Sequence, residues 1–255
     1  MRVLTGIPGF DEITSGGLLK GRTYLVLGGP GAGKTIFSLQ YICNGAISYD
    51  EPGIYVTLEE SVESIVTTAK SLGWDIDSLQ AEGKVRIIDA SPYYSPVVAT
   101  KYAIRTESVL GEAEFEINSV IDIINKSIIE LGATRLVIDA LTPLIIQYKT
   151  LFEARMKILS LIKALKELEG VTSLITAEVI PPNWESTLFG IERYVVDGVI
   201  MLYYIRVRGE RIRGVEVVKL RGSPHSHSIH PFKITPKGII IYPKEKLTWD
   251  EERIL

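Results

Sequence analysis

The sequence predicts an α/β fold in which a mostly parallel sheet is flanked by helices and extended by antiparallel strands at its C-terminal edge. Two observations predict the parallel part: short apolar runs alternate with helix-length amphipathic stretches, and Gly and Pro residues separate them. A third predicts the edge, because only strand-like runs follow Val195. No change of composition marks a linker, so residues 1–255 are expected to form one domain.

The first five strand-like runs are rich in Val, Ile and Leu, as expected for strands that helices cover on both faces. The stretches between them carry apolar residues at helical spacing. The predicted strands span residues 23–27, 53–58, 84–89, 135–139 and 171–176, and the predicted helices span 34–48, 61–72, 114–131 and 152–169. The apolar face predicted for the last helix consists of Met156, Leu159, Ile162, Leu165 and Leu168.

The final part of the chain contains strand-like runs with no helix between them. Such runs are expected to pair antiparallel, since parallel neighbours need a long crossover. A hairpin turn is predicted at residues 208–210. The predicted strands span residues 198–207, 213–220, 232–235 and 238–242.

The composition is that of a folded globular chain, with 46% hydrophobic and 23% charged residues. The formal net charge of -3 gives no overall attraction to nucleic acids or anionic membranes. Cys43 is the only cysteine, which excludes an internal disulfide and a cysteine-based zinc site. No apolar stretch is long enough to span a membrane, so we expect a cytoplasmic protein. Asn and Gln are scarce, which predicts a thermophilic source.

Residues 28–35, GGPGAGKT, match the phosphate-binding pattern G-x-x-x-x-G-K-[ST]. The loop follows a predicted strand and precedes a predicted helix, a context that disfavours an accidental glycine-rich turn. Its backbone amides can bind phosphate oxygens, Lys34 adds a positive charge, and the Thr35 hydroxyl can coordinate Mg²⁺. The loop therefore predicts binding of a nucleoside triphosphate with Mg²⁺. The expected contacts are Gly29, Pro30, Gly31, Ala32, Gly33, Lys34, Thr35 and Ile36.

Two predicted strands end in acidic residues at the edge where parallel sheets place ligands. Asp139 ends the run RLVID and is expected to hold Mg²⁺ through water, the alternative being an ordinary helix cap. Ala140, which follows it, cannot act as a base. Glu59 and Glu60 follow another strand and are candidates to activate the attacking water, the alternative being two solvated cap residues.

Several segments together resemble the KaiC family of RecA-like P-loop NTPases and the archaeal RadA paralogues close to KaiC. They occur in the same order and cover almost the whole chain. KaiC carries two such domains and this sequence has one, so the chain resembles the single-domain KaiC-like ATPases of archaea. The segments are residues 5–41, 50–61, 71–75, 135–141, 217–226 and 231–243.

The resemblance implies ATP and Mg²⁺ as cofactors, ATP hydrolysis as the reaction, and Glu59 as the catalytic glutamate. Thr176 and Glu178 match the position where relatives sense the γ-phosphate. In KaiC, the Lys and Arg of KLRG reach the nucleotide of a neighbouring subunit, which implies such roles for Lys219 and Arg221. The further nucleotide contacts that the resemblance implies are Ser71, Leu220, Ser223, His225 and Thr235.

An active homo-oligomer is therefore expected, either a ring or a short filament, with a hexamer favoured. The sequence offers no arginine-finger candidate beside the phosphate loop, which favours donation of Arg221 by a neighbour. From the residues alone, Lys219 and Arg221 would be exposed edge-strand charges that resist aggregation.

A recombinase-like role on single-stranded DNA is an alternative. Residues 179–195 lie where recombinases hold a DNA-binding loop and contain Trp184, Phe189 and Arg193. The hairpin supplies a second basic cluster, for which a solvated surface or a subunit contact is an equal alternative. With a net charge of -3, DNA binding is expected to be weak or moderate and salt-sensitive. The hairpin arginines are Arg206, Arg208, Arg211 and Arg213.

Three classes of function remain at this stage. The resemblance favours an oligomeric ATPase whose cycle regulates a protein partner. A DNA-repair ATPase comes second. An autokinase comes last, because the phosphorylated residues of KaiC belong to its second domain and have no clear equivalent here.

Overall fold

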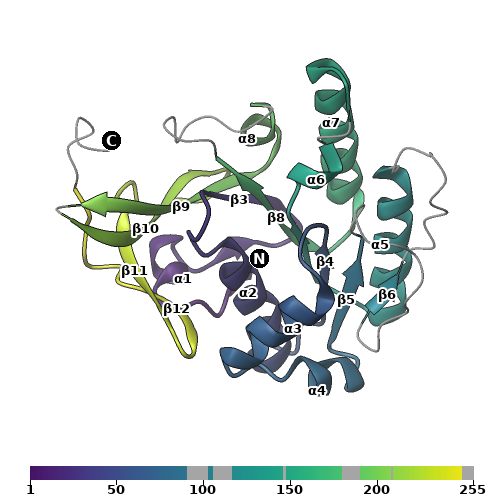
Figure 1. Cartoon of the computed structure of the whole chain (residues 1–255), viewed down its shortest axis with the longest axis horizontal. Helices are drawn as coiled ribbons and strands as arrows, with labels where there is room; N and C mark the ends of the chain where they lie inside the picture. The colour runs from purple at the N-terminus through teal and green to yellow at the C-terminus, as the bar shows by residue number, and fades with distance from the viewer. Residues whose placement is uncertain (91–102, 106–116, 146–147, 180–189, 208, 249–255) are drawn as a thin grey trace.

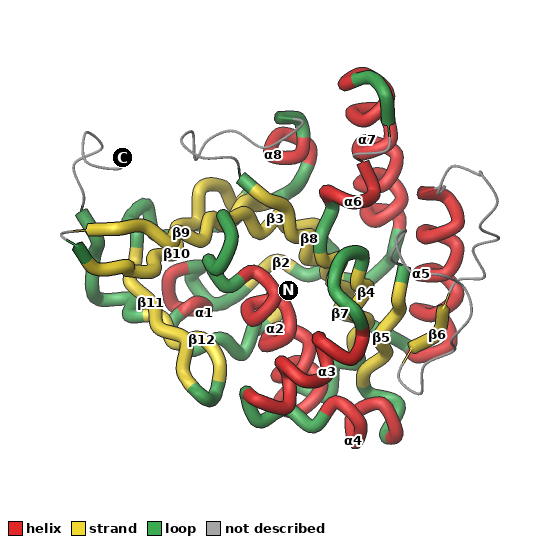
Figure 2. Tube along the Cα trace, viewed as in Figure 1, coloured by secondary structure: helices red, strands yellow, loops and turns green. Residues whose placement is uncertain are grey.

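A computed structural model describes residues 1–90, 103–105, 117–145, 148–179, 190–207 and 209–248. In this part of the chain, a ten-stranded sheet runs through the molecule with helices on both of its faces (Figures 1 and 2). The strand order is β12-β11-β10-β9-β3-β8-β7-β4-β5-β6. The pairs from β9 to β6 are parallel and those from β9 to β12 are antiparallel, which confirms the predicted fold class.

The central parallel strands β3, β4, β7 and β8 are buried on both faces. Side chains of β3 therefore alternate between two cores, with Tyr24 and Val26 in one and Leu25 and Leu27 in the other. This explains why the sequence of these strands is apolar without alternation. The strands of the parallel part are β3 (Thr23–Gly28), β4 (Gly53–Thr57), β5 (Val85–Asp89), β6 (Ala103–Arg105), β7 (Arg135–Asp139) and β8 (Thr172–Glu178).

The helices divide between the two faces of the sheet. Residues of α1 (Phe10–Ile13), α2 (Lys34–Ser48), α3 (Val62–Ser71) and α4 (Ile76–Ala81) pack into the first core. Residues of α5 (Ile117–Leu131), α6 (Thr142–Ile145) and α7 (Leu151–Glu167) pack into the second. The short α8 (Glu192–Val195) comes directly before β9.

The late strands lie beneath the start of α2. A Cβ atom placed on Gly33 would lie 3.3 Å from Ile234 Cδ1, so β11 packs directly against the glycine loop. These strands are β9 (Gly198–Val207), β10 (Glu210–Leu220), β11 (His230–Thr235) and β12 (Gly238–Ile241). A separate two-stranded sheet joins β1 (Arg2–Val3) and β2 (Leu18–Leu19).

The long predicted elements agree with the structure within three residues, and the helix predicted at 34–48 coincides with α2. The apolar face predicted for α7 was wrong in part: Ile162 and Leu165 are buried, but Met156 is 50% exposed. A strict spacing of three residues drifts around a helix with 3.6 residues per turn. The buried face consists of Ala154, Ile158, Leu161, Ile162 and Leu165. Within the described residues, no helix combines the length and apolar character needed to cross a membrane.

Candidate nucleotide-binding site

The predicted phosphate loop connects the carboxyl end of β3 to the amino end of α2. Gly31 and Gly33 have φ angles of +72° and +104°, a conformation that glycine adopts without strain. Gly33 is the N-cap of α2, and no side chain caps the helix there. The first amides of α2 therefore remain available to an anion, and the dipole of this 15-residue helix favours negative charge at the same point.

Lys34 lies over the loop that precedes it. Its Nζ donates hydrogen bonds to the carbonyl oxygens of Gly28 (2.9 Å) and Gly29 (3.3 Å). Burial lowers the pKa of Lys34, while the negative charges of Glu178, Asp139 and Glu59 oppose that shift. A cation surrounded in this way can compensate the charge of bound phosphates.

Asp139 is the point where three hydroxyl groups meet. Its Oδ2 accepts hydrogen bonds from Thr35 Oγ1 (2.9 Å) and from the Tyr55 hydroxyl, and its Oδ1 accepts one from Thr176 Oγ1. Burial and the neighbouring Asp139 charge raise the pKa of Tyr55, so this phenol stays a proton donor. The sequence did not single out Tyr55, although its position in a strand beside β7 places it here.

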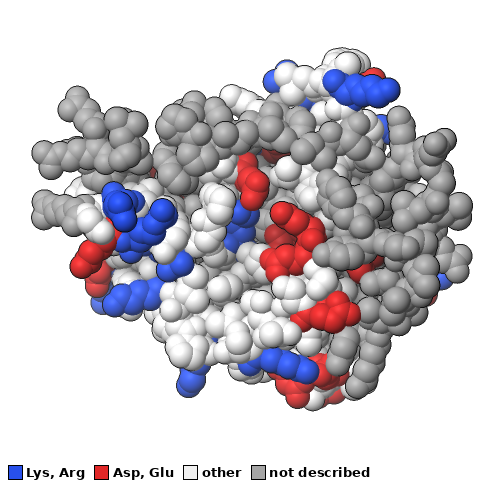
Figure 3. Space-filling model, viewed as in Figure 1, with Lys and Arg blue, Asp and Glu red and all other residues white. Residues whose placement is uncertain are grey.

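The two candidate catalytic glutamates differ in their surroundings. Glu60 Oε1 lies 3.3 Å from Thr35 Oγ1, and Glu60 Oε2 accepts a hydrogen bond of 2.8 Å from Ser64. Within the described part of the chain, the Glu59 carboxylate makes no hydrogen bond. Partial burial and the negative charges of Glu178 and Asp139 raise the pKa of Glu59, while Lys34 opposes the shift. Acidic side chains gather beside the loop that follows β4 (Figure 3).

The oxygen atoms of Thr35, Asp139 and Glu60 suit Mg²⁺, which prefers hard oxygen ligands. Among the residues that the structure describes, no set of three or more His, Cys, Asp or Glu side chains is placed to hold a metal ion by itself. Mg²⁺ in nucleotide sites usually takes one or two protein ligands and completes its shell with water and phosphate oxygens. The side chains present therefore fit a nucleotide-bound Mg²⁺.

Lys219 and Arg221 lie away from this cluster. In the sheet, Lys219 is opposite Val199, and Val199 is opposite Leu25 near the middle of β3. The Arg221 backbone amide donates a hydrogen bond to the Asp197 carbonyl oxygen. The Asp197 amide in turn donates to the carbonyl oxygen of Thr23, at the start of β3. Gly28 is five residues beyond Thr23, which is about 16 Å along a strand.

Both cations are bound to the C-terminal carbonyl groups of α8. Lys219 Nζ donates to the carbonyl oxygens of Arg193 (3.0 Å), Tyr194 (3.2 Å) and Val196 (2.8 Å). An Arg221 N–H donates to the Tyr194 carbonyl oxygen over 2.9 Å. Burial and the nearby Arg221 charge lower the pKa of Lys219. The structure does not bring this pair to the phosphate loop of its own chain.

The other predicted contacts are also dispersed. The Ser71 hydroxyl bonds to the Thr68 carbonyl oxygen within α3. Leu220 is buried in the first core, so only its backbone can reach a nucleotide. Ile36 packs against the same core, and the Ser223 hydroxyl accepts a hydrogen bond of 2.6 Å from Arg2.

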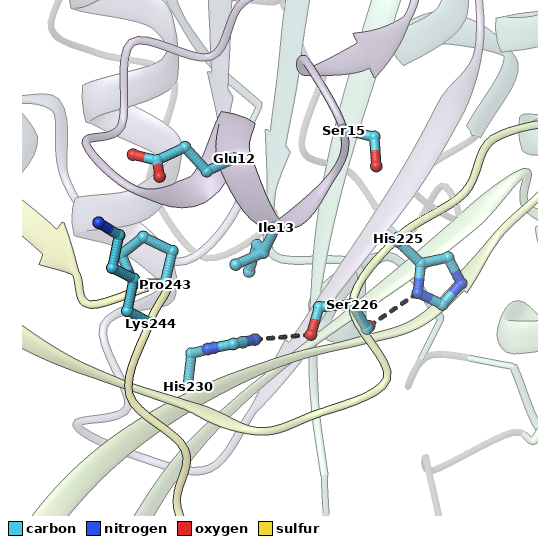
Figure 4. A pocket seen from close by; sticks show the side chains of 8 residues that line it. All are labelled: Glu12, Ile13, Ser15, His225, Ser226, His230, Pro243 and Lys244. Carbon is cyan, nitrogen blue, oxygen red and sulfur yellow. Dashed lines mark hydrogen bonds between the residues drawn. The ribbon is translucent and has the colours of Figure 1, made fainter.

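His225 lines a pocket of about 360 Å³ between α1, the segment before β11 and the segment after β12 (Figure 4). The pocket includes His230, whose Nε2 lies 2.7 Å from Ser226 Oγ, and it includes no residue of the phosphate loop. Thr235 lies at the opposite end of β11, where its hydroxyl bonds within the β11–β12 turn. His225 and Thr235 are therefore not neighbours within one chain.

One arginine that the sequence did not single out for the phosphate loop lies beside it. Arg213 of β10 donates hydrogen bonds to the Gly31 carbonyl oxygen. The sequence pattern could not predict this contact, because residues 31 and 213 become neighbours only when β9 pairs with β3 and β10 pairs with β9. Basic side chains cluster over the β9–β10 hairpin in Figure 3. Trp184, Phe189 and Arg208 lie outside the described residues.

A family model described as "ATPase: KaiC" matches residues 3–246. The chain belongs to the KaiC ATPase family. Relatives include the circadian clock oscillator protein KaiC of Synechococcus elongatus, 38% identical over 95% of this chain and 44% of its own length, and KaiC of Thermostichus vulcanus, 39% identical over the same shares. The chain thus spans less than half of these KaiC proteins.

A solved KaiC-like protein from the hyperthermophilic archaeon Pyrococcus horikoshii OT3 is similar in structure as well. Its TM-score is 0.80 and its identity 34%, and the match covers 95% of this chain and 99% of that chain. This match shows the KaiC-like fold over nearly the whole length of both chains.

Proposed function

We propose that this chain binds ATP with Mg²⁺ and hydrolyses it to ADP and phosphate. The observation that carries the proposal is the convergence of Lys34, Thr35 and Asp139 with Glu59 and Glu60 beside one glycine loop. They come from the carboxyl ends of β4 and β7, two neighbouring strands of the parallel sheet, and from the start of α2. Membership of the KaiC ATPase family supports the same reaction.

Each group has a role that follows from its surroundings. The loop amides and Lys34 hold the phosphates, and Thr35 and Asp139 hold Mg²⁺. When bound, Mg²⁺ would neutralise charge on the phosphate oxygens. Thr176 keeps the Asp139 carboxylate oriented from the neighbouring strand.

Glu59 is the better-supported base of the two glutamates. Glu60 is hydrogen-bonded to Thr35 and Ser64, whereas Glu59 forms no hydrogen bond with any residue that the structure describes and has a raised pKa. Glu59 takes a proton from the attacking water, the water oxygen bonds to the γ-phosphorus, and the bond to the ADP oxygen breaks.

The proposal includes a homo-oligomer with ATP between subunits, most simply a hexameric ring. Lys219 aligns with Leu25, about 10 Å along the strand from Gly28, and Arg221 aligns with Thr23, about 16 Å from it. Both side chains are bound to carbonyl oxygens around α8 and would have to leave them to reach the loop of their own chain. A neighbouring subunit can present them to that loop instead. The printed name of the KaiC relatives, circadian clock oscillator protein, favours an ATPase cycle with a regulatory role. We propose that this cycle acts on a protein partner, in the cytoplasm as the sequence predicts.

Single-stranded DNA binding is a second candidate. Arg206 and Arg211 are exposed on adjacent strands, directly opposite each other. Basic side chains at a hairpin attract phosphate backbones, and such binding weakens steeply with salt. Stimulation of ATP hydrolysis by single-stranded DNA would favour this candidate over regulation of a protein partner.

The test of the main proposal is a set of three variants assayed for ATP binding and for phosphate release with and without Mg²⁺. Lys34→Ala should weaken ATP binding. Glu59→Gln should bind ATP and lose turnover, while the matched Glu60→Gln should keep part of it. Full activity in Glu59→Gln would reject this residue as the base, and an inactive wild-type chain would reject the proposed reaction.

A further inference from the structure

Arg213, Tyr204 and Gly31 form one stack at the edge of the phosphate loop. Arg213 Nε and Nη2 lie 3.4 and 3.2 Å from the Gly31 carbonyl oxygen. The Arg213 guanidinium carbon lies 4.1 Å from the centroid of the Tyr204 ring. A Cβ placed on Gly31 would lie 3.5 Å from that same ring. The ring thus contacts both the loop and the arginine that binds it.

The sheet register creates this contact. Gly28, the last residue of β3, is opposite Leu202 of β9, and Tyr204 is two residues further along β9. Residues two apart share a face of a strand, so Tyr204 continues past the end of β3 into the space beside the loop. Arg213 of β10 is opposite Tyr204 and therefore lies on the same face.

The contact bears on the peptide that joins Gly31 to Ala32. Phosphate binding requires backbone amides that point toward the anion and carbonyl oxygens that point away from it. The guanidinium draws the Gly31 carbonyl oxygen toward β10. It also adds a permanent positive charge beside the loop, separate from that of Lys34.

We propose that Arg213 is a positioning residue for the phosphate loop of its own subunit, with Tyr204 holding its guanidinium in place. The inference rests on the proposed ATP binding and adds to it a cation from the same chain. Arg213 also connects the loop to the β9–β10 hairpin. There the guanidinium carbon of Arg211 lies 4.9 Å from the centroid of the same Tyr204 ring.

Arg206 provides a matched control. It is an exposed arginine on the same hairpin, and within the described residues it has no side-chain contact with Tyr204 or with the loop. Replacing either arginine by alanine changes the net charge equally. A difference between the two variants therefore reports the position of Arg213 rather than its charge alone.

The experiment measures the Kd of Mg²⁺-ATP and of tripolyphosphate, which engages the phosphate loop without a nucleoside. Arg213→Ala should raise both Kd values about tenfold, the scale expected for loss of a charge-assisted hydrogen bond at the loop. Arg213→Lys should recover part of the affinity, because it keeps the charge but loses the planar fork. Arg206→Ala should stay within about twofold of wild type. In turnover assays, KM should rise while kcat changes little, because Arg213 does not touch the reacting atoms.

A second pair of variants tests the role of the ring without removing the arginine. Tyr204→Phe keeps the stack and should bind ATP as wild type does, whereas Tyr204→Leu should weaken binding in the direction of Arg213→Ala. Thermal unfolding without ligand checks that each variant is folded. Equal Kd values for Arg213→Ala and Arg206→Ala would overturn this inference alone. A wild-type chain that binds neither probe would overturn the proposed ATP binding and this inference with it.

Discussion

Tyr55 and Asp139 are joined by a hydrogen bond between buried atoms of two neighbouring strands, β4 and β7. Tyr55 is opposite Val137 in the register, so its hydroxyl reaches two residues along β7 to the strand end. With Thr176 on the other oxygen, Asp139 is held from both flanking strands. If the Thr35 hydroxyl leaves Asp139 to bind a metal ion, the hydrogen bonds from Tyr55 and Thr176 can still hold the Asp139 carboxylate.

Tyr55→Phe should weaken the coupling between ATP and Mg²⁺. The variant removes only the hydroxyl, leaves the ring volume, and lets the Asp139 carboxylate rotate. We expect the Mg²⁺ concentration at half-maximal ATP binding to rise about tenfold, the lower end of what loss of a group behind a metal ligand costs. A titration with Mg²⁺ at fixed ATP measures this.

Tyr24→Phe is the matched control for that titration. The Tyr24 hydroxyl is bonded to the backbone of Leu19 rather than to Asp139. Its removal should leave the Mg²⁺ midpoint unchanged. Identical midpoints for Tyr55→Phe and wild type would show that the hydroxyl does not orient Asp139.

The pH dependence of hydrolysis should report Glu59 and its neighbour Glu178. Partial burial, then the charge of Glu178, raises the pKa of Glu59, so activity should fall on the acid side as Glu59 takes up its proton. Glu178→Gln removes a negative charge and therefore lowers the pKa of Glu59. The acid limb of the kcat/KM profile should move to lower pH. A limb that stays in place or moves to higher pH would contradict the assignment of Glu59 as base.

Much of this site was predictable from sequence, because local context identifies its parts. The loop motif lies between a strand and a helix, Asp139 ends an apolar strand, and Glu59 comes shortly after another. The hydrogen bond between Tyr55 and Asp139 exists because β4 lies beside β7 in the sheet. The order of strands depends on how the whole chain folds, so local sequence patterns do not give it. The contact of Arg213 with Gly31 likewise depends on β9 pairing with β3 on one side and β10 on the other.

An ion pair between a fully buried arginine and a partly buried glutamate should contribute strongly to stability. The Arg135 side chain is fully buried and bonds to Glu51 and to the Tyr41 and Leu4 carbonyl oxygens. Glu51→Ala leaves this guanidinium without its counter-charge. We expect the free energy of unfolding to fall by about 3 kcal/mol.

Urea denaturation measures that loss, and Glu82→Ala supplies the comparison. Glu82 pairs with Lys84 at 3.1 Å, but the Glu82 side chain is 54% exposed and the Lys84 side chain 36% exposed. Loss of such an exposed pair should cost less than about 1 kcal/mol. Equal losses for Glu51→Ala and Glu82→Ala would mean that the Arg135 charge is satisfied by the backbone carbonyls alone.

Subunit mixing should reveal whether Arg221 acts on a neighbour. In its own chain, Arg221 is bonded to the Tyr194 carbonyl oxygen at the β3 end remote from the loop. Arg221→Ala and Glu59→Gln should each be inactive alone. An equal mixture should recover about a quarter of wild-type activity, because in a head-to-tail ring that fraction of interfaces pairs an intact Glu59 with an intact Arg221.

The control mixes Glu59→Gln with a variant that carries both substitutions, since no interface in that mixture regains an intact Glu59. Its activity should stay at background, which separates true complementation from contamination or refolding. Exchange of subunits is verified by energy transfer between labelled chains. Exchange without recovery in the first mixture, or full activity in a dilute monomer, would exclude donation of Arg221 across the interface. Recovery that rises with ATP concentration would agree with nucleotide that binds, and so stabilises, only the assembled state.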